Sequence, residues 1–278
     1  MVRRPAGPAA LHTEHTEHTT QGNQMDTTAS TQPGTAVVTG AGSGIGRAVA
    51  RQFLAAGFEV VLAGRRRAAL EETAASHPRA HVLPTDVTRP DDVARLFEYV
   101  ATELGAMSVL FNNAGVFGPA GAVDEVDPGE WAHTVAVNIT GAFLCAAAAV
   151  RLMKVQHPQG GRIINNGSIS AHAPRPLSVA YTTTKHAITG LTKSIELDGR
   201  PFGITCGQID IGNAHTQLME TIGVSGGALQ ADGSRRPEPT FPVEEAARAV
   251  LLMAQLPASA SVGSLLITAS GMPFVGRG

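Results

Sequence analysis

From Thr35 onward, short apolar runs rich in β-branched residues alternate with longer segments of helical periodicity. This alternation predicts parallel strands joined by crossover helices, because two parallel neighbours need a long connection between them. We therefore expect an α/β fold with a doubly wound parallel sheet of about seven strands and helices on both faces. The expected strands are TAVVT from Thr35, EVVLA from Glu59, AHVLP from Ala80, SVLFNN from Ser108, GRIINN from Gly161, GITCGQ from Gly203 and SLLIT from Ser264.

The segments between these runs carry the signals of helix ends. Proline opens the helices expected over 90–105 and 242–256, and glycine closes those expected over 45–57 and 178–199, as helix termini prefer. Sheets of this kind bind ligands beyond the carboxyl ends of their strands. Residues that directly follow the strands are therefore the first candidates for a site.

The length and composition favour one folded domain preceded by a tail. With 278 residues, 43% of them apolar, the chain can bury one large core, and we expect a single domain over 34–278. The polar, Thr-rich segment 1–33 has no periodicity, so we expect it to be disordered. Its histidines repeat every three residues, but a flexible tail fixes no coordination geometry, so we expect no metal site. Met25 is an alternative translation start.

Charge and cysteine content exclude several classes of partner. Lys and Arg total 21 against 23 Asp and Glu, so no strong field favours nucleic acid or a membrane surface. No apolar run reaches about 18 residues, and the N-terminus lacks the apolar core of a secretory signal. Cys145 and Cys206 are far apart in small or apolar surroundings, which is typical of buried thiols in a reducing compartment. We expect a soluble, cytoplasmic protein.

A glycine-rich turn follows the first expected strand and opens a helix, in the sequence VVTGAGSGIGRAV. The spacing G-x-x-x-G-x-G uses Gly40, Gly44 and Gly46 and differs from the common G-x-G-x-x-G. Glycines in this position let backbone N–H groups at the positive end of a helix approach a pyrophosphate. Since glycines also make ordinary tight turns, the turn alone leaves both interpretations open.

The end of the second strand bears on which dinucleotide binds. A carboxylate there would accept a hydrogen bond from the ribose 2′-OH of NAD, whereas an arginine would pair with the 2′-phosphate of NADP. This chain reads VVLAGRRRAAL, with Gly64 and Arg65 where the carboxylate is expected. NADP(H) is therefore favoured and NAD(H) stays possible, because the arginines at 65–67 could also form a solvated helix start.

Tyr181 and Lys185 lie four residues apart in the helix expected over 178–199. Both side chains are therefore on one face of the helix and can act on the same small region. An ammonium group favours the phenolate form of a nearby tyrosine and brings its pKa, near 10 in water, closer to the range useful for acid–base catalysis. The spacing is common by chance. By itself it favours the interpretation as two polar side chains on a helix surface.

Several motifs in the right order resemble the short-chain dehydrogenase/reductase family. TGAGSGIG at 39–46 is similar to its cofactor turn, and NNAG at 112–115 is similar to the segment beside the adenine ring. VNITGAF places Asn138 at the family's asparagine, and INNGS ends in Ser168, thirteen residues before Tyr181. The resemblance implies a Rossmann fold and a nicotinamide cofactor. The residues it implies as cofactor contacts are Gly40, Ser43, Gly44, Ile45, Gly46, Arg65, Asp86, Val87, Asn113, Ala114, Gly115, Tyr181, Lys185, Gly207 and Ile209.

The resemblance also implies the catalytic roles. Ser168 would orient a substrate carbonyl or alcohol, and Tyr181 would exchange the proton while the cofactor exchanges the hydride. Lys185 would hold the nicotinamide ribose and lower the tyrosine pKa. Asn138 would hold a water that connects the lysine to solvent. Asp86 in LPTDVT would contact the adenine, although a role in capping its own loop is an equal alternative.

The resemblance weakens after the sixth strand. The family has a Pro-Gly pair followed shortly by Thr, whereas CGQIDIGNAHTQL places Cys206 at the proline, keeps Gly207 and displaces Thr216. The segment 213–240 is rich in Gly, Ser and Pro, and a loop of that length is usually functional, here as a lid or substrate wall, although an insertion without a role is the alternative. The apolar MPFV near the C-terminus should pack on a surface.

The expected function is NADP(H)-dependent interconversion of a secondary alcohol and a ketone, with a small-molecule substrate. The segment SAHAPRPLS, which includes His172, suggests a fairly apolar pocket without a fixed charge partner. Alternatives are an NAD-dependent dehydrogenase of the same family, a catalytically silent dinucleotide-binding regulator, and a sugar-nucleotide epimerase or dehydratase. The Ala-rich segment 141–153 would let another backbone approach, and the resemblance implies a homo-oligomer, a dimer or tetramer.

Overall fold

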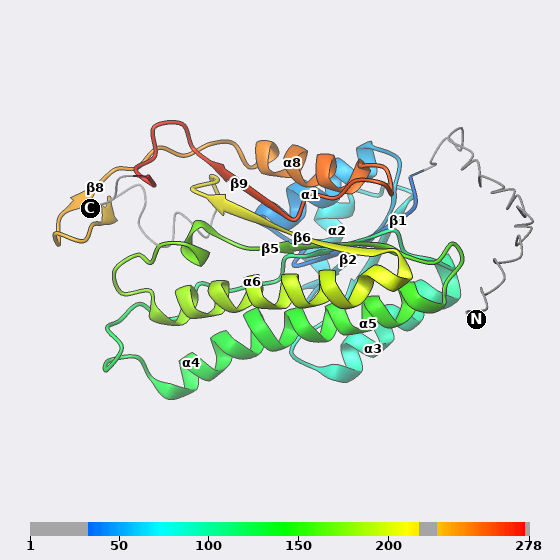
Figure 1. Cartoon of the computed structure of the whole chain (residues 1–278), viewed down its shortest axis with the longest axis horizontal. Coiled ribbons are helices and arrows are strands. Elements are labelled where there is room, and N and C mark those ends of the chain that lie inside the picture. Colours follow the sequence, from blue (N-terminus) through cyan, green and yellow to red (C-terminus); the bar gives the residue numbers. More distant parts are fainter. Residues whose placement is uncertain (1–32, 217–226, 276–278) are drawn as a thin grey trace, which may run out of the picture. The chain divides into compact units, whose positions relative to one another are not determined.

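The computed structural model of the chain describes residues 33–216 and 227–275. Most of the segment expected to be disordered, the histidine repeat and Met25 lie outside these residues, as does part of the 213–240 loop. The domain is an α/β fold in which strands and helices alternate (Figure 1).

One parallel sheet of seven strands forms the centre of the domain, in the order β3-β2-β1-β4-β5-β6-β9. The order reverses between β1 and β4, because the chain builds outward from β1 to β3 and then returns to the other side. This reversal is where doubly wound sheets bind ligands. The strands are β1 Thr35–Thr39, β2 Glu59–Gly64, β3 Ala80–Pro84, β4 Val109–Asn112, β5 Gly161–Asn166, β6 Ile204–Gly212 and β9 Ser264–Thr268.

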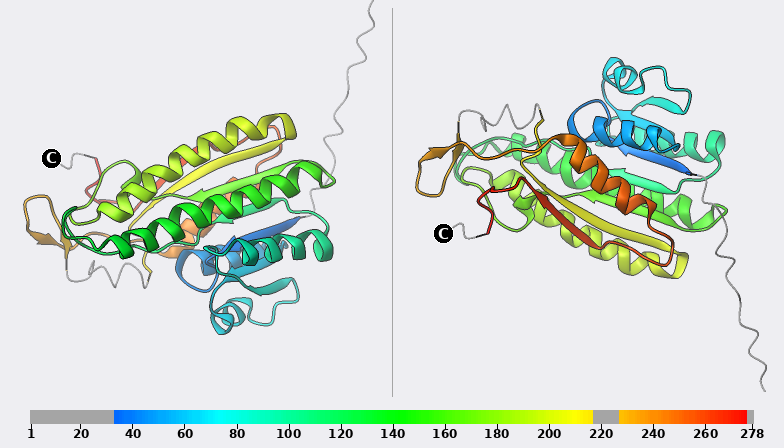
Figure 2. Two further views of the ribbon diagram at one scale, coloured as in Figure 1. Left: turned by 90° about the horizontal axis from the view of Figure 1, so that it is seen from below. Right: turned by 90° about the horizontal axis from the view of Figure 1, so that it is seen from above.

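Helices cover both faces of this sheet (Figure 2). Helices α1, α2 and α8 pack on one face, where α1 contacts α8, while α3, α5 and α6 pack on the other. The expected fold class, with its seven strands and two helical layers, is confirmed. The helices are α1 Gly44–Ala55, α2 Arg67–Ala74, α3 Pro90–Tyr99, α4 Pro128–Val135, α5 Ala142–Val155, α6 Val179–Gly199 and α8 Val243–Gln255.

Two hydrophobic cores explain why the central strands are apolar throughout. Along β1, Ala36 and Val38 belong to the core beneath α1 and α8, and Val37 between them belongs to the core beneath α3 and α5. Successive side chains of a strand point to opposite faces, so a sheet covered on both faces needs apolar residues at every position.

The stretch from Pro128 to Val155 is one continuous helix in which a π-helical turn, Ala136–Gly141, joins α4 to α5. Its length, and the mean hydropathy of 1.8 over an 18-residue window within it, match those of a membrane-crossing helix. Cys145, Ala149 and Met153 are nevertheless fully buried in the domain's own core. The hydropathy of this stretch is therefore that of a helix packed on a sheet.

Two expected boundaries differ from the structure. The sixth strand was expected to end at Gln208, but β6 continues to Gly212 because its second half pairs with β9, from Gln208 with Ser264 to Gly212 with Thr268. Within the segment expected to be a long loop, β7 Ala228–Leu229 and β8 Arg235–Arg236 form a short antiparallel hairpin. This hairpin lies beyond the carboxyl ends of the strands (Figure 1).

Candidate functional site

In the turn after β1, glycines allow backbone segments to approach each other more closely than a side chain would permit. A Cβ on Gly46 would lie 2.2 Å from the carbonyl oxygen of Gly40, and a Cβ on Gly40, whose φ is +67°, would lie 3.0 Å from Cα of Ala114. The first turn of α1 contains no acidic residue, and the side chain of its N-cap, Ser43, makes no capping hydrogen bond. The positive end of α1 is therefore left for an anion from outside the helix.

A cavity of about 360 Å³ extends from this turn across the carboxyl ends of the strands. That volume is in the range of small-molecule and cofactor sites. The predicted site residues that line it are Gly40, Ser43, Gly44, Ile45, Gly46, Arg65, Asp86, Val87, Asn113, Ala114, Gly115, Ser168, Tyr181 and Lys185.

Arg65 and Arg66 follow β2 and line the cavity. Among the residues that the structure describes, no carboxylate lies within salt-bridge distance of either guanidinium. Arg67, by contrast, is in α2, pairs with Glu71 at 3.7 Å and does not line the cavity. Arg65 and Arg66 are thus available to a negative group in the cavity, whereas Arg67 already has an acidic partner on its own helix.

Asp86 caps its own loop and also lines the cavity. Its Oδ1 accepts hydrogen bonds from the backbone N–H of Thr88 at 3.0 Å and from the Thr88 hydroxyl at 2.7 Å, which caps the loop. The residue also lines the cavity. Burial raises the pKa of Asp86, but the hydrogen bonds from Thr88 and the charge of Arg65 outweigh it, so the net shift is downward. The carboxylate is therefore ionised at neutral pH.

The NNAG segment ties together three strands. The Thr39 hydroxyl, at the end of β1, accepts from the backbone N–H groups of Asn113 at 2.9 Å and Ala114 at 3.0 Å. Asn113 Nδ2 donates to the carbonyl of Thr39, and Asn113 Oδ1 accepts from Asn166 Nδ2 on β5, both at 2.9 Å. These bonds fix the floor of the cavity at the reversal of strand order.

Ser168 is held in place by Asp210. The residue follows β5 and caps a short 3₁₀ turn, its Oγ accepting from the backbone N–H of Ser170 at 3.1 Å. Its own N–H donates to Asp210 Oδ1 at 2.9 Å, and Asp210 is completely buried. A Cβ on Gly167 would lie 2.0 Å from that same oxygen. Only glycine at 167 lets the carboxylate reach the serine backbone.

Tyr181 and Lys185 lie in the first turns of α6 and line the cavity together with Ser168. Lys185 is buried, its Nζ donates to the carbonyl of Asn166 at 2.7 Å, and it lies 5.5 Å from the centre of the Tyr181 ring. The predicted pair and the predicted serine therefore meet in one place. The interpretation as two side chains on a helix surface is wrong for Lys185, which is 6% exposed.

Burial dominates the proton affinities at this end of the cavity. It raises the pKa of Tyr181, as does the charge of Asp210, while a hydrogen bond with Ser168 and the charge of Arg175 act against it. Burial lowers the pKa of Lys185 to about 8, against an upward effect of Asp210. The net shift of the Tyr181 pKa is therefore upward, although Ser168 and Arg175 act downward, whereas Lys185 was expected to lower it.

Asn138 is a buried residue of the π-helical turn and does not line the cavity. Its side chain donates to the carbonyl of Val116 at 2.8 Å and to the hydroxyl of Thr184 at 3.1 Å, and accepts from the N–H of Val116 at 2.8 Å. It thus connects the segment after β4 to α6 next to Lys185. Single π-helical turns within α-helices are frequently found at functional sites.

Gly207 and Ile209, predicted as cofactor contacts, do not line the cavity. Both lie inside β6, where Gly207 pairs with Ile164 and Ile209 is fully buried. Because β6 ends at Gly212, the residues at the sheet edge are Ile211 and Gly212, and Thr216 follows shortly after them and lines the cavity. Gly207 is therefore inside a strand, and Ile211, Gly212 and Thr216 are residues of this segment that line the cavity.

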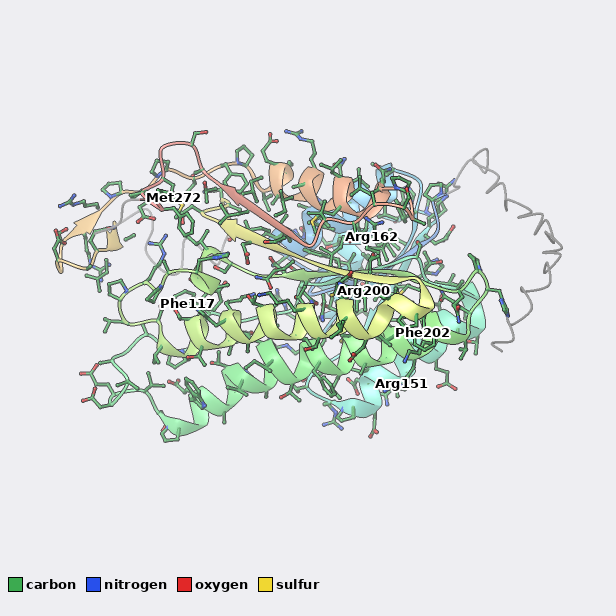
Figure 3. The ribbon with its side chains drawn as sticks, in the orientation of Figure 1. Phe117, Arg151, Arg162, Arg200, Phe202 and Met272 are labelled. Carbon is green, nitrogen blue, oxygen red and sulfur yellow. The ribbon has the colours of Figure 1, made fainter. Side chains whose placement is uncertain are left out.

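Phe117 and Arg175 are among the lining residues that the sequence did not single out by a role. Phe117 stacks on Tyr181, with ring centres 4.7 Å apart, near the N-terminal end of α6 (Figure 3). Arg175 lines the cavity and forms an ion pair with Glu238 beside the hairpin. Neighbouring residues do not mark either one as a site residue. Phe117 follows the NNAG motif without belonging to it, and Glu238, the partner of Arg175, lies 63 residues away in the sequence.

The histidine and the cysteines considered in the sequence do not contribute side chains to the cavity lining. His172 does not line the cavity, and its Nε2 lies 2.8 Å from Asp210 Oδ2. Cys145 and Cys206 are both free and buried, as expected, and burial raises the pKa of Cys145 to about 12. Within 33–216 and 227–275, no three His, Cys, Asp or Glu residues gather into a group suited to a metal ion.

The residues present fit a nicotinamide dinucleotide. The glycine turn and the free end of α1 suit a pyrophosphate, Arg65 and Asp86 line the stretch beside it, and Ser168, Tyr181 and Lys185 line the far end. The buried side-chain oxygen of Asn166, a lining residue, has no hydrogen-bond partner among the described residues. It is an acceptor that a ligand hydroxyl would satisfy.

Comparison with known proteins agrees with this geometry. The family model described as short chain dehydrogenase matches residues 34–224. A 3beta-hydroxysteroid dehydrogenase of Mediterraneibacter gnavus is 36% identical over 191 residues, which cover 66% of this chain and 67% of the relative. A cis-4-hydroxycyclohexanecarboxylate dehydrogenase of Sinomonas cyclohexanicum is 32% identical over 244 residues, 86% of this chain and 96% of the relative.

A solved structure has the same fold. The 3-ketoacyl-(acyl-carrier-protein) reductase of Brucella melitensis, complexed with NADH, superposes with a TM-score of 0.75 at 25% identity. The match covers 84% of this chain and 96% of that protein.

Proposed function

Because the chain belongs to the short-chain dehydrogenase/reductase family, we propose that it interconverts a secondary alcohol and a ketone with NADP(H), using Tyr181 as the acid–base group. Its membership makes it an NAD(P)-dependent oxidoreductase acting on hydroxyl or keto groups. The observation that carries the finer proposal is that one cavity joins the glycine turn to Ser168, Tyr181 and Lys185.

The roles follow from position and proton affinity. The Ser168 hydroxyl is oriented by its place after β5 and holds the substrate oxygen beside Tyr181. In ketone reduction the Tyr181 hydroxyl gives its proton to that oxygen, and in alcohol oxidation the tyrosine takes the proton back. The bound nicotinamide supplies or accepts the hydride. Asn138, whose side chain binds Val116 and Thr184, positions α6.

The preference for NADP(H) is supported by Arg65. It lines the cavity directly after β2, where a 2′-phosphate is recognised in folds of this type. NAD(H) is the alternative, and the reductase of Brucella melitensis carries NADH. Arg65→Ala should weaken NADPH binding about 10- to 100-fold, the effect of one charge-assisted hydrogen bond, and leave NADH nearly unchanged. Arg67→Ala, which removes the neighbouring surface arginine, is the matched control.

The first test is a titration with NADPH and with NADH, each followed by nicotinamide fluorescence, and then addition of ketones to the tighter complex. NADPH preference with ketone-dependent oxidation supports the proposal. Equal loss of both cofactors in Arg65→Ala refutes the NADP preference. Binding without turnover of any ketone points to the dinucleotide-binding regulator, and a tightly bound nucleotide sugar points to the epimerase or dehydratase.

A homo-oligomer is a second proposal, supported by exposed apolar side chains on neighbouring helices. Helices α5 and α6 lie side by side (Figures 1 and 2). Phe143 on α5 is 53% exposed and Leu197 on α6 is 63% exposed. Light scattering of the purified protein would give the mass, and a monomer at micromolar concentration would refute it. The cytoplasmic location also stays a prediction, which fractionation of cells that express the protein would test.

A further inference from the structure

A buried ion pair joins the active-site segment to the hairpin. Arg175, between β5 and α6, donates from Nη2 to Glu238 Oε2 at 2.6 Å and from Nη1 to Oε1 at 3.2 Å. The Arg175 side chain is 13% exposed and that of Glu238 only 1%. A bidentate pair of this kind has a fixed geometry and little access to water.

Two amide side chains also contact the pair. Asn213 at the end of β6 accepts from Arg175 Nη2 at 2.9 Å and donates to Glu238 Oε2 at 2.8 Å. Gln230 in the hairpin donates to Glu238 Oε1 at 3.2 Å. Asn213 has a φ of +59°, a strained value that asparagine tolerates better than most residues. The backbone accepts this strain where the amide bridges both charged partners.

The two members of the pair lie differently with respect to the cavity. Arg175 and Asn213 line it, together with Tyr181, whereas Glu238 does not. The carboxylate therefore stands behind the arginine. Burial alone would raise the pKa of Glu238, but the hydrogen bonds from Arg175, Asn213 and Gln230 lower it to about 2. Glu238 is thus ionised throughout the working pH range and neutralises the arginine.

Among the described residues, the basic side chains Arg175 and Lys185 at the substrate end each have a buried acidic neighbour. Lys185 lines the cavity and Asp210 is buried behind Ser168, close enough to affect the lysine's proton affinity. Arg175 is matched by Glu238. The other lining side chains at this end are mainly apolar: Val116, Phe117, Val137, Ile169, Ile211 and Ala214.

From this arrangement we infer that Glu238 is a specificity-determining residue, which neutralises Arg175 and restricts the site to uncharged ketones and alcohols. A carboxylate-bearing substrate would have to compete for Arg175 with a buried carboxylate that is already in bidentate contact. It would also lose its hydration at a largely apolar end of the cavity, where, among the described residues, Arg175 and Lys185 already have buried acidic neighbours. The inference rests on the proposed ketone–alcohol function.

The test compares two matched pairs of probes with NADPH: ethyl acetoacetate against acetoacetate, and methyl 4-oxocyclohexanecarboxylate against its free acid. The measured quantity is the ratio of kcat/KM for ester over acid. The wild-type ratio should exceed about 10. Glu238→Gln leaves Arg175 without its counter-charge, so the ratio should fall at least about 10-fold, and added salt should weaken the new activity on the acids.

A double variant separates charge from folding. Arg175→Gln combined with Glu238→Gln removes both charges, so the preference for esters should return even though the ion pair is gone. If Glu238 only anchored the hairpin, the double variant would be impaired like the single one and the ratio would not recover. Glu245→Gln, which breaks an exposed pair with Arg248 on α8, is the control and should leave the ratio unchanged.

Failure of the specificity role of Glu238 and failure of the proposed ketone reduction would give different results. A wild-type preference for the acids, or a ratio that Glu238→Gln does not change, overturns the specificity inference alone. Reduction of no member of either pair by the wild-type protein contradicts the proposed ketone reduction, and the inference with it.

Discussion

The carboxylate of Asp210, in β6, accepts a hydrogen bond from the backbone N–H of Ser168 at 2.9 Å. The same oxygen accepts from Gln208 Nε2 at 2.7 Å, and the other oxygen lies 2.8 Å from His172 Nε2. A buried charge therefore fixes the serine that is proposed to hold the substrate oxygen, and it lies close enough to influence both Tyr181 and Lys185.

Replacing this charge should shift the pH dependence of the reaction. A negative charge disfavours the phenolate and favours the ammonium, so Asp210 raises the pKa of both Tyr181 and Lys185. Asp210→Asn removes the charge and keeps an acceptor for Ser168. Ketone reduction needs the protonated tyrosine, so its decline at high pH should begin at lower pH in the variant. A pH profile of kcat/KM measures this, and an unmoved profile would contradict the electrostatic role.

Asp210→Ala should cost more than Asp210→Asn, because it also leaves the N–H of Ser168 buried without a partner. Such a group costs about 1–3 kcal/mol. Denaturant unfolding of the two variants provides the comparison. Equal stabilities would mean that the hydrogen bond to Ser168 is not significant.

Tyr181→Phe should abolish most turnover and spare cofactor binding. Loss of a positioned acid–base group lowers kcat by about 10²- to 10⁴-fold. The phenylalanine ring keeps the stacking on Phe117, so the affinity for NADPH should change only a few-fold. Steady-state kinetics and a fluorescence titration of the same preparation test both statements. Activity near the wild-type level would exclude Tyr181 as the proton donor.

Lys185→Met should change how stability depends on pH. The pKa of Lys185 falls from 10.5 to about 8 on folding because of burial. Between these values the unfolded chain binds more protons than the folded one, so this lysine makes wild-type stability rise with pH. Between pH 7.5 and 10, the unfolding free energy of the wild type should therefore rise by about 1–3 kcal/mol relative to that of the variant. Parallel stability curves would show that Lys185 is not desolvated.

Gly46→Ala should eliminate cofactor binding. The added Cβ would lie 2.2 Å from the Gly40 carbonyl oxygen, a backbone atom that cannot move without opening the turn. Gly190→Ala on α6 is the control, since a Cβ there meets nothing within 4 Å, and it should be neutral or stabilise the helix by up to about 1 kcal/mol. NADPH titration of both variants decides. Normal binding by Gly46→Ala would refute the close fit of this turn.

The sequence alone determined the features whose signals are local. The alternation from Thr35 predicted the seven strands and two helical layers, because the period of burial along a strand or helix is written in neighbouring residues. The resemblance of short motifs such as TGAGSGIG and INNGS to a known family, rather than their spacing alone, implied most of the site residues that line the cavity. Each of these motifs consists of neighbouring residues, so the sequence displays it directly.

Only the tertiary structure decided the features that depend on partners distant in the chain. β6 continues past Gln208 because β9 pairs with it, more than fifty residues later. As a result Gly212 and Thr216 line the cavity, and Gly207 and Ile209 do not. Arg175 meets Glu238 across 63 residues, and Asp210 meets Ser168 across 42. The sequence around a charged residue does not show which distant residue of opposite charge it will pair with. Its electrostatic role is set by the packing that brings the two together and excludes water from them.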